Sequence, residues 1–182
     1  MIKNLFLVFT LIFILKANEQ KFIARQGQIT FFSYTTVENI EATNNQVLSI
    51  FNPESSEIAV SILMRAFNFE KALMHEHFNE SYVESDLFPQ ATFEGTIINF
   101  DAKSEAIQTR LVKGNFTLKD ITKEIEFKAQ IARNKKQNSY IITGKIKLQR
   151  DDYNIKVPAM LRPNIAKNIE VSFNFQYEPY ED

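Results

Sequence analysis

"KEIEFKAQIAR", residues 123–133, decides the fold class of this chain. Ile125, Phe127, Ala129 and Ile131 alternate there with charged or amide side chains. Strict alternation of apolar and polar residues is typical of a β-strand that has one buried and one solvated face. The stretch therefore predicts a strand of an antiparallel sheet whose apolar face covers a core.

The same period of two recurs along most of the chain, and runs such as "NPESSE" and "NKKQNS" mark turns between the segments. Eight strands at this spacing predict an all-β antiparallel barrel or sandwich. The pattern does not choose between a soluble barrel with its apolar face inward and an outer-membrane barrel, although the polar insertion at 70–90 favours the soluble form. The expected strands lie at residues 28–34, 46–51, 57–64, 91–99, 107–118, 123–133, 139–149 and 168–177.

The period changes between residues 70 and 85. Met74, Phe78 and Tyr82 follow one another at intervals of four, which places them in one apolar stripe of a helix. Pro89 disfavours helix at the residue before it, so the helix should end before that point. The sequence predicts one α-helix near residues 70–85, at one end of the sheet structure.

Both histidines of the chain lie on this helix, but they do not predict a metal site. At about 100° per residue, His75 and His77 point roughly 160° apart and cannot bind one ion. We expect His75 to be partly buried beside the apolar stripe. The three glutamates at 76, 80 and 84 form a charged face that we expect to be solvated.

The composition gives no support for an enzyme or for nucleic-acid binding. The chain has no Cys, only four Gly and no "GxSxG" motif, so we expect no catalytic residue, no cofactor and no metal. A net charge of −1 at pH 7 argues against a nucleic-acid partner. Seventeen Phe among 182 residues suit either a thick core or an apolar cavity.

The N-terminus predicts export. Lys3 precedes an apolar run at residues 5–15, and a polar segment follows Ala17. This layout is typical of a secretory signal peptide, and the run is too short for a transmembrane helix. We therefore expect a signal peptide at 1–19 and a domain at 20–182 in the bacterial periplasm or outside the cell, with an uncleaved N-terminal anchor as the alternative.

Three separated motifs resemble the YceI-like family of periplasmic polyisoprenoid-binding proteins. "FEKALMHEHFNESYVESDLFPQATFEGTI" (69–97) resembles its acidic helix followed by "FPxATFxG". "VKGNFTLKDITKEIEF" (112–127) resembles its central hairpin, with Lys119-Asp120 in place of the usual His-Gly. "LQRDDYNI" (148–155) resembles its "NRxDFGI" segment, with Asn154 in place of Gly.

This resemblance implies an eight-stranded, lipocalin-like antiparallel barrel that encloses an elongated apolar cavity. The expected ligand is a long-chain amphiphile such as a polyisoprenoid, an isoprenoid quinone or a fatty-acid derivative, held for carriage or storage. A homodimer is possible. The family offers no polar signature for catalysis that could be transferred to this chain.

The candidate ligand-binding residues are those on the apolar faces of the expected strands, and a filled barrel would have the same pattern as a hollow one. Arg65 and Arg150, each at the end of an expected strand, are candidates to meet a headgroup, although either could be a surface ion-pair partner instead. The cavity candidates are Ile58, Val60, Ile62, Met64, Phe67, Phe127, Ile131, Ile142, Ile146, Val171 and Phe173.

Two other functions remain open at this point. A filled barrel or sandwich could act only through protein contacts, for example in envelope stress. A barrel enzyme could act on a lipid substrate inside the cavity. A dry interior would favour the first alternative, and turnover that depends on His75 or Asp151 would favour the second.

Overall fold

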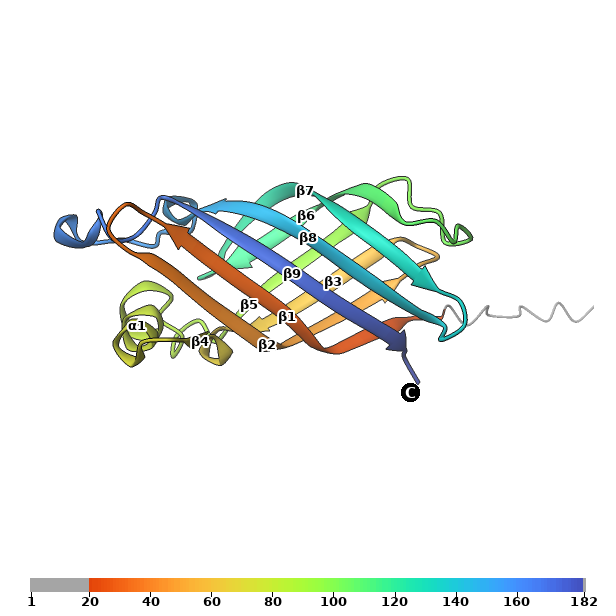
Figure 1. The fold of residues 1–182 in the computed structure, drawn as a ribbon, viewed down its shortest axis with the longest axis horizontal. Coiled ribbons are helices and arrows are strands. Elements are labelled where there is room, and N and C mark those ends of the chain that lie inside the picture. The colour runs from red at the N-terminus through yellow and green to blue at the C-terminus, as the bar shows by residue number, and fades with distance from the viewer. Residues whose placement is uncertain (1–19, 182) are drawn as a thin grey trace, which may run out of the picture.

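The computed structural model describes residues 20–181, so the expected signal peptide at 1–19 lies outside the described residues. Eight long antiparallel strands form the body of the molecule (Figure 1). Their bounds are β1 (Phe22–Tyr34), β2 (Asn39–Asn52), β3 (Glu57–Leu63), β5 (Gln90–Ile97), β6 (Gln108–Leu118), β7 (Ile121–Asn134), β8 (Ser139–Gln149) and β9 (Asn168–Pro179).

These eight strands close into a barrel. The strand order is β1-β9-β8-β7-β6-β5-β3-β2, and β2 pairs back with β1, so each strand of the ring has two partners. A two-residue strand, β4 (Asn68–Phe69), pairs with the edge of β2 as a short addition. The predicted eight-stranded antiparallel barrel is therefore confirmed, and closure leaves no long edge strand unpaired.

The first two strands are longer than their alternation predicted. β1 begins at Phe22 rather than near residue 28, because its early part contains an irregularity at Gly27 that breaks the period of two. The pairing of β1 with β2 shifts register on both sides of Gly27. A bulge of this kind puts an extra residue into one strand and hides the alternation from sequence reading.

The turn between β6 and β7 explains one departure from the family pattern. Lys119 and Asp120 both have positive φ, 51° and 57°, and join the paired residues Leu118 and Ile121. A two-residue hairpin with both φ positive matches the twist of antiparallel strands. Asp adopts this left-handed conformation readily, whereas Lys does so at a cost of about 1 kcal/mol. Asn154, which replaces the family's Gly, is left-handed as well, with φ 53°.

The expected helix is present but shorter, and it has two parts. An α-helix, α1 (Ala72–His77), continues directly into a π-helical turn, η2 (Phe78–Tyr82). The Val83 amide donates to the Phe78 carbonyl, five residues back, at 2.9 Å. Such π-turns are uncommon and occur often at functional sites. No helix within residues 20–181 is both long and apolar enough to span a membrane.

One expectation about this helix was wrong. His75 is exposed rather than partly buried, and its ring lies 5.9 Å from that of Phe69. The six-residue α1 contains no buried residue at all, because it lies across the end of the barrel rather than inside it.

The barrel has two different ends, which Figure 1 shows at left and right. The helical segment and the long connection between β8 and β9 lie at one end, which we call the mouth end. That connection contains two short 3₁₀ turns, η3 (Arg150–Tyr153) and η4 (Ala159–Leu161). The loops that follow β2, β5 and β7 lie at the other end, which we call the closed end.

Candidate ligand-binding cavity

A cavity of about 290 Å³ occupies the mouth half of the barrel interior. Side chains from all eight barrel strands line it, and nearly all of them are aliphatic or aromatic. Its mouth-end lining comes from the helical segment, through Met74, Phe78 and Tyr82, and from the β8–β9 connection, through Ile155 and Leu161. The interior is therefore hollow at one end, with two non-strand segments over the opening.

The structure brings most of the predicted apolar residues together. Ile131 is the exception, because it is 1% exposed in the packed core and does not line the cavity. Its cross-strand partner Ile142 does line it, so the boundary between filled and hollow interior falls near this pair. The predicted residues that line the cavity are Ile58, Val60, Ile62, Met64, Phe67, Phe127, Ile142, Ile146, Val171 and Phe173.

The two candidate headgroup residues lie in different places. Arg65 is 64% exposed and pairs with the Asp86 carboxylate on the outer surface, away from the cavity lining. Arg150 follows β8 directly, is only 11% exposed and lines the cavity. Its guanidinium lies 3.7 Å from the Asp151 carboxylate, and its Nε has no hydrogen-bond partner among residues 20–181.

An aromatic cluster borders the cavity at the mouth end. The rings of Phe31, Phe67, Phe69 and Phe78 lie 5.1–5.7 Å apart, and Phe78 contacts the other three. These distances are typical of favourable aromatic pairs. Phe78 is supplied by the π-turn, so the cluster fastens the helical segment over the barrel. The i, i+4 stripe in the sequence carried this information, but Phe78 and its neighbours Met74 and Tyr82 were not predicted as site residues.

Lys119 fastens the same segment from the other side. Its Nζ donates to the Tyr82 carbonyl at 3.0 Å and lies 2.5 Å from the Glu84 carboxylate, while its side chain is only 8% exposed. It also lies 5.9 Å from the centre of the Phe88 ring. The β6–β7 turn is thus tied to the end of the helical segment. The unfavourable backbone conformation of Lys119 is offset by these contacts.

Tyr153 is a buried tyrosine that lines the cavity. It is 2% exposed, and its ring meets that of Phe116 edge-on at 5.4 Å. Burial, with a smaller contribution from the Asp152 carboxylate, raises the pKa of Tyr153 to about 12. The phenol therefore remains protonated at any ordinary pH and can donate or accept a hydrogen bond.

Aromatic packing fills the closed end. Phe51 is fully buried, and its ring lies 5.5 Å from that of Phe100, 5.4 Å from Tyr140 and 5.8 Å from Tyr177. The Tyr177 hydroxyl and the Ser49 hydroxyl are hydrogen-bonded at 2.6 Å. Burial raises the pKa of Tyr177 strongly. These contacts pack the interior of the barrel at this end.

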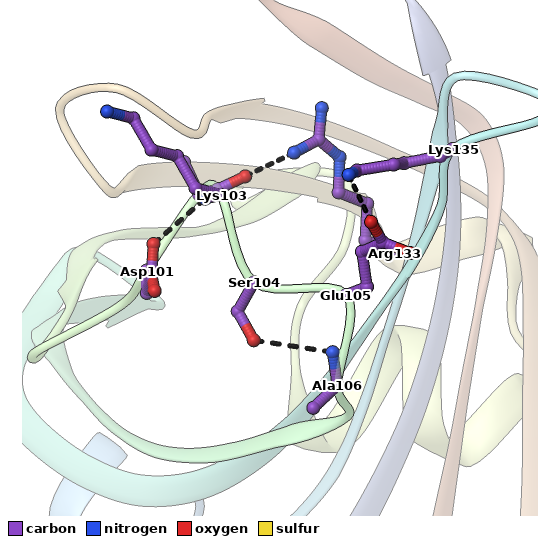
Figure 2. A network of polar contacts seen from close by, with 8 residues as sticks. Asp101, Lys103, Ser104, Glu105, Ala106, Arg133 and Lys135 are labelled. Atoms are coloured by element: carbon purple, nitrogen blue, oxygen red, sulfur yellow. Dashed lines mark hydrogen bonds and ion pairs between the residues drawn. The ribbon is translucent and has the colours of Figure 1, made fainter.

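A polar network holds the closed-end loop at 98–107 against β7. Arg133 donates to the Ala102 carbonyl. Lys135 is paired with the Glu105 carboxylate (Figure 2). The pairing between Lys135 and Glu105 lowers the pKa of that carboxyl. These contacts keep the loop over the aromatic core, so the barrel is covered there by both packing and hydrogen bonding.

Small residues make room for the large rings inside the barrel. A Cβ at Gly144 would lie 2.6 Å from Cζ of Phe173, its cross-strand neighbour, which is closer than any ordinary contact. Gly95 and Gly114 are paired across β5 and β6 in the same way, beneath the ring of Phe93. Glycine at these inward positions lets the rings lie flat on the wall and leaves the centre of the barrel open.

The polar side chains around the cavity are mostly engaged in structural contacts. Glu38 pairs with Lys71 at 2.6 Å, and the Ser33 hydroxyl accepts a hydrogen bond from the Ala166 amide at 2.8 Å. In residues 20–181, no group of three or more His, Cys, Asp or Glu side chains is placed to hold a metal ion. What the arrangement can do chemically is bury an apolar chain and meet a polar end near Arg150 and Tyr153.

A family model described as YceI-like domain matches residues 20–177. This chain belongs to the YceI-like family. The resemblance in the three motifs is thereby confirmed over almost the whole described domain. A comparison with curated proteins finds no match.

Several solved structures share this YceI-like fold. One is described as a polyisoprenoid binding domain from Saccharophagus degradans implicated in plant cell wall breakdown, with a TM-score of 0.73, 15% identity, and coverage of 89% of this chain and 99% of that one. Burkholderia cenocepacia BcnA has a TM-score of 0.69 at 15% identity, covering 82% and 95%. The Campylobacter jejuni YceI protein has 0.65 at 15% identity, covering 82% and 90%. At this identity the likeness shows the fold.

Proposed function

We propose that this protein is an exported binding protein that holds a long-chain amphiphile in the barrel cavity, for carriage or storage. The ligand class is a polyisoprenoid, an isoprenoid quinone or a fatty-acid derivative. The observation that carries the proposal is the apolar cavity, hollow at the mouth and filled at the closed end. A protein acting only through outer contacts would have no need of such a hollow.

The cavity volume limits how much of a tail is buried. At about 30 Å³ per water-sized group, 290 Å³ holds about ten methylene-sized groups. Burying ten methylenes contributes about 8 kcal/mol before the costs of association. A tail of about this length is enclosed fully, and a longer isoprenoid extends through the mouth.

Arg150 is the residue we propose for the polar end of the ligand. Its Nε lacks a partner, and a buried N–H without an acceptor costs about 1–3 kcal/mol. A headgroup oxygen beside it would remove that cost. Tyr153, neutral and buried nearby on the same 3₁₀ turn, is the proposed second polar contact.

Family membership and the fold neighbours support a binding role. The Saccharophagus degradans domain is described as polyisoprenoid-binding, and the match to this chain covers 99% of that domain. The polar groups beside the cavity also favour binding over catalysis, because Glu38 and Ser33 are already occupied by Lys71 and the Ala166 amide. Export is proposed from the N-terminal pattern of charge and apolar residues.

Native mass spectrometry of protein purified without detergent tests this proposal, followed by organic extraction of anything bound. We expect a bound species of defined mass that is released on unfolding. A chain that is apo as purified, and that takes up neither an isoprenoid quinone nor a fatty amide on incubation, would overturn the proposal.

A matched pair of variants on β8 locates the bound species. Ile146 lines the cavity, whereas Ile141 on the same strand faces outward and is 41% exposed. Ile146→Trp should lower the occupied fraction because the larger side chain fills the hollow. Ile141→Trp should leave the occupied fraction unchanged, and equal losses in the two variants would place the ligand elsewhere.

A further inference from the structure

The connection from Asn154 to Asn168 has two sides with different roles. Its inner side lines the cavity through Ile155, Val157, Leu161 and Ile165. The connection projects at the mouth end, at the far left of Figure 1. Its η4 turn contains Met160. Met160 is 88% exposed, the highest value among the large hydrophobic side chains of residues 20–181. We call this segment the mouth loop.

The mouth loop is also distinctly basic. Lys156, Arg162 and Lys167 are all exposed, and residues 153–169 contain no Asp or Glu. The helical segment across the mouth has the opposite character, since Glu76 and Glu80 are exposed there. The two sides of the opening therefore differ in charge, and the basic side is the one with the exposed methionine.

A polar depression lies behind the tip of the mouth loop. It measures about 490 Å³ and adjoins the apolar cavity, with Arg150, Ile155 and Val157 lining both. Three cationic residues, Arg150, Lys156 and Arg162, line it together with the acidic Asp151, and guanidinium and ammonium groups suit phosphate oxygens. The residues that line it are Arg150, Asp151, Asn154, Ile155, Lys156, Val157 and Arg162.

Further exposed apolar side chains surround the mouth on other segments. Val37, in the β1–β2 turn, is 62% exposed, and Leu73 on α1 is 61% exposed. Isolated exposed apolar residues are common on soluble proteins. Met160, Val37 and Leu73 lie on three separate segments around one opening, and of its two sides the basic one, which carries Met160, suits an interface of apolar chains and anionic groups.

We propose that the mouth loop docks the barrel on the surface of an anionic lipid bilayer. Met160 enters the acyl region, while Lys156 and Arg162 contact lipid phosphates, as amphipathic membrane anchors do. The inner side of the loop then continues the apolar path from the bilayer to the cavity. The inference rests on the proposed function in one respect, because it takes the ligand to be a membrane lipid.

Sedimentation with vesicles tests this docking, using phosphatidylcholine alone and phosphatidylcholine mixed with phosphatidylglycerol. The wild type should bind the mixed vesicles, more weakly at high salt. The double variant Met160→Ser/Arg162→Gln should bind at least about tenfold more weakly, since one cation near an anionic surface accounts for about fivefold. The matched control is Ile107→Ser/Lys136→Gln at the closed end, where Ile107 is 71% exposed, and it should bind as the wild type does.

Three results would overturn the docking proposal. The wild type could fail to bind mixed vesicles, the two double variants could bind alike, or the mouth-loop variant could convert a dimer to a monomer in sedimentation equilibrium. The last result would identify a second copy of the chain as the partner. Met160→Ser alone, which alters no hydrogen bond, keeps the test valid if the double variant folds poorly.

The failure of this inference is distinguishable from failure of the proposed function. If mass spectrometry detects bound lipid but the protein does not sediment with vesicles, the cavity is filled and the docking proposal alone fails. Protein that binds vesicles but never carries lipid has the docking surface without the carrier role.

Discussion

The contact between Gly144 and Phe173 gives a test of how the cavity is shaped. A Cβ added at residue 144 would lie 2.6 Å from Cζ and 2.8 Å from Cε1 of the Phe173 ring. Carbon atoms prefer about 3.5–4.0 Å, so the ring must move by about 1 Å towards the lumen. Phe175, stacked at 5.2 Å, and Phe127, edge-on at 5.6 Å, resist that movement.

Gly144→Ala should therefore cost about 1–3 kcal/mol in the free energy of unfolding and reduce the amount of lipid retained. Adding Phe173→Leu should remove the clash with the ring and leave the milder 3.0 Å contact with the Lys128 carbonyl oxygen, so the double variant should recover most of the lipid retention. It should also be more stable than the sum of the two single changes predicts, with a coupling of about 1 kcal/mol or more. Urea unfolding at constant temperature, compared at equal m-values, measures the stability differences.

Gly114 supplies the matched control for this cycle. A Cβ there would lie 2.2 Å from the Glu94 carbonyl oxygen, which is backbone, as well as 2.8 Å from Cζ of Phe93. Trimming Phe93 to Leu therefore cannot rescue Gly114→Ala. Additivity within about 0.5 kcal/mol for Gly144 and Phe173 would refute the reasoning. Equal rescue of both pairs would refute it too.

Three further predictions concern stability. Tyr177→Phe should cost about 0.5–1.5 kcal/mol in urea unfolding, because the buried Ser49 oxygen loses its hydrogen bond to the Tyr177 hydroxyl while it still donates to the Ala59 carbonyl, and an unchanged midpoint would contradict the hydrogen bond. The raised pKa of Tyr153 contributes stability that is fully present below pH 10, the ordinary tyrosine value, and is lost as the pH rises through about 12. In Tyr153→Phe, the free energy of unfolding should therefore fall less steeply between pH 10 and pH 12 than in the wild type. Lys119→Ala should lower the free energy of unfolding by about 1–2 kcal/mol and increase amide exchange in the helical segment, because the partly exposed Glu84 and the Tyr82 carbonyl lose their cation. Amide exchange equal to that of the wild type would show that the contact does not hold the segment.

The sequence was enough to predict the barrel because period-two alternation is a local signal. Each strand could be recognised from its own residues, and Pro89 and the i, i+4 stripe marked the helix in the same way. The start of β1 was missed because the irregularity at Gly27 interrupts the alternation without changing the pairing partner. The π-turn at Phe78 was missed because nothing in its composition distinguishes it from an ordinary helical turn.

The cavity was only partly predictable because its boundary depends on packing between distant strands. Ile131 and Ile142 are equivalent in sequence pattern and paired in register, yet only Ile142 lines the hollow. Arg65 and Arg150 each lie in a 3₁₀ turn that follows a strand, Met64–Ala66 after β3 and Arg150–Tyr153 after β8. One turn directs its arginine outward to Asp86, and the other leaves its arginine at the cavity. The mouth loop lacks alternation altogether, so only the structure assigns its apolar residues an inner and an outer side.

The division of the barrel into a filled and a hollow half has an energetic consequence. Leaving 290 Å³ unfilled costs on the order of 7 kcal/mol if each cubic ångström of apolar cavity costs about 24 cal/mol. That is comparable to the whole stability of an ordinary domain, about 5–15 kcal/mol. The Phe51 cluster at the closed end and the ring of eight paired strands offset this cost without a ligand. A bound tail recovers it, so the same hollow that lowers the stability of the empty barrel supplies the affinity for its ligand.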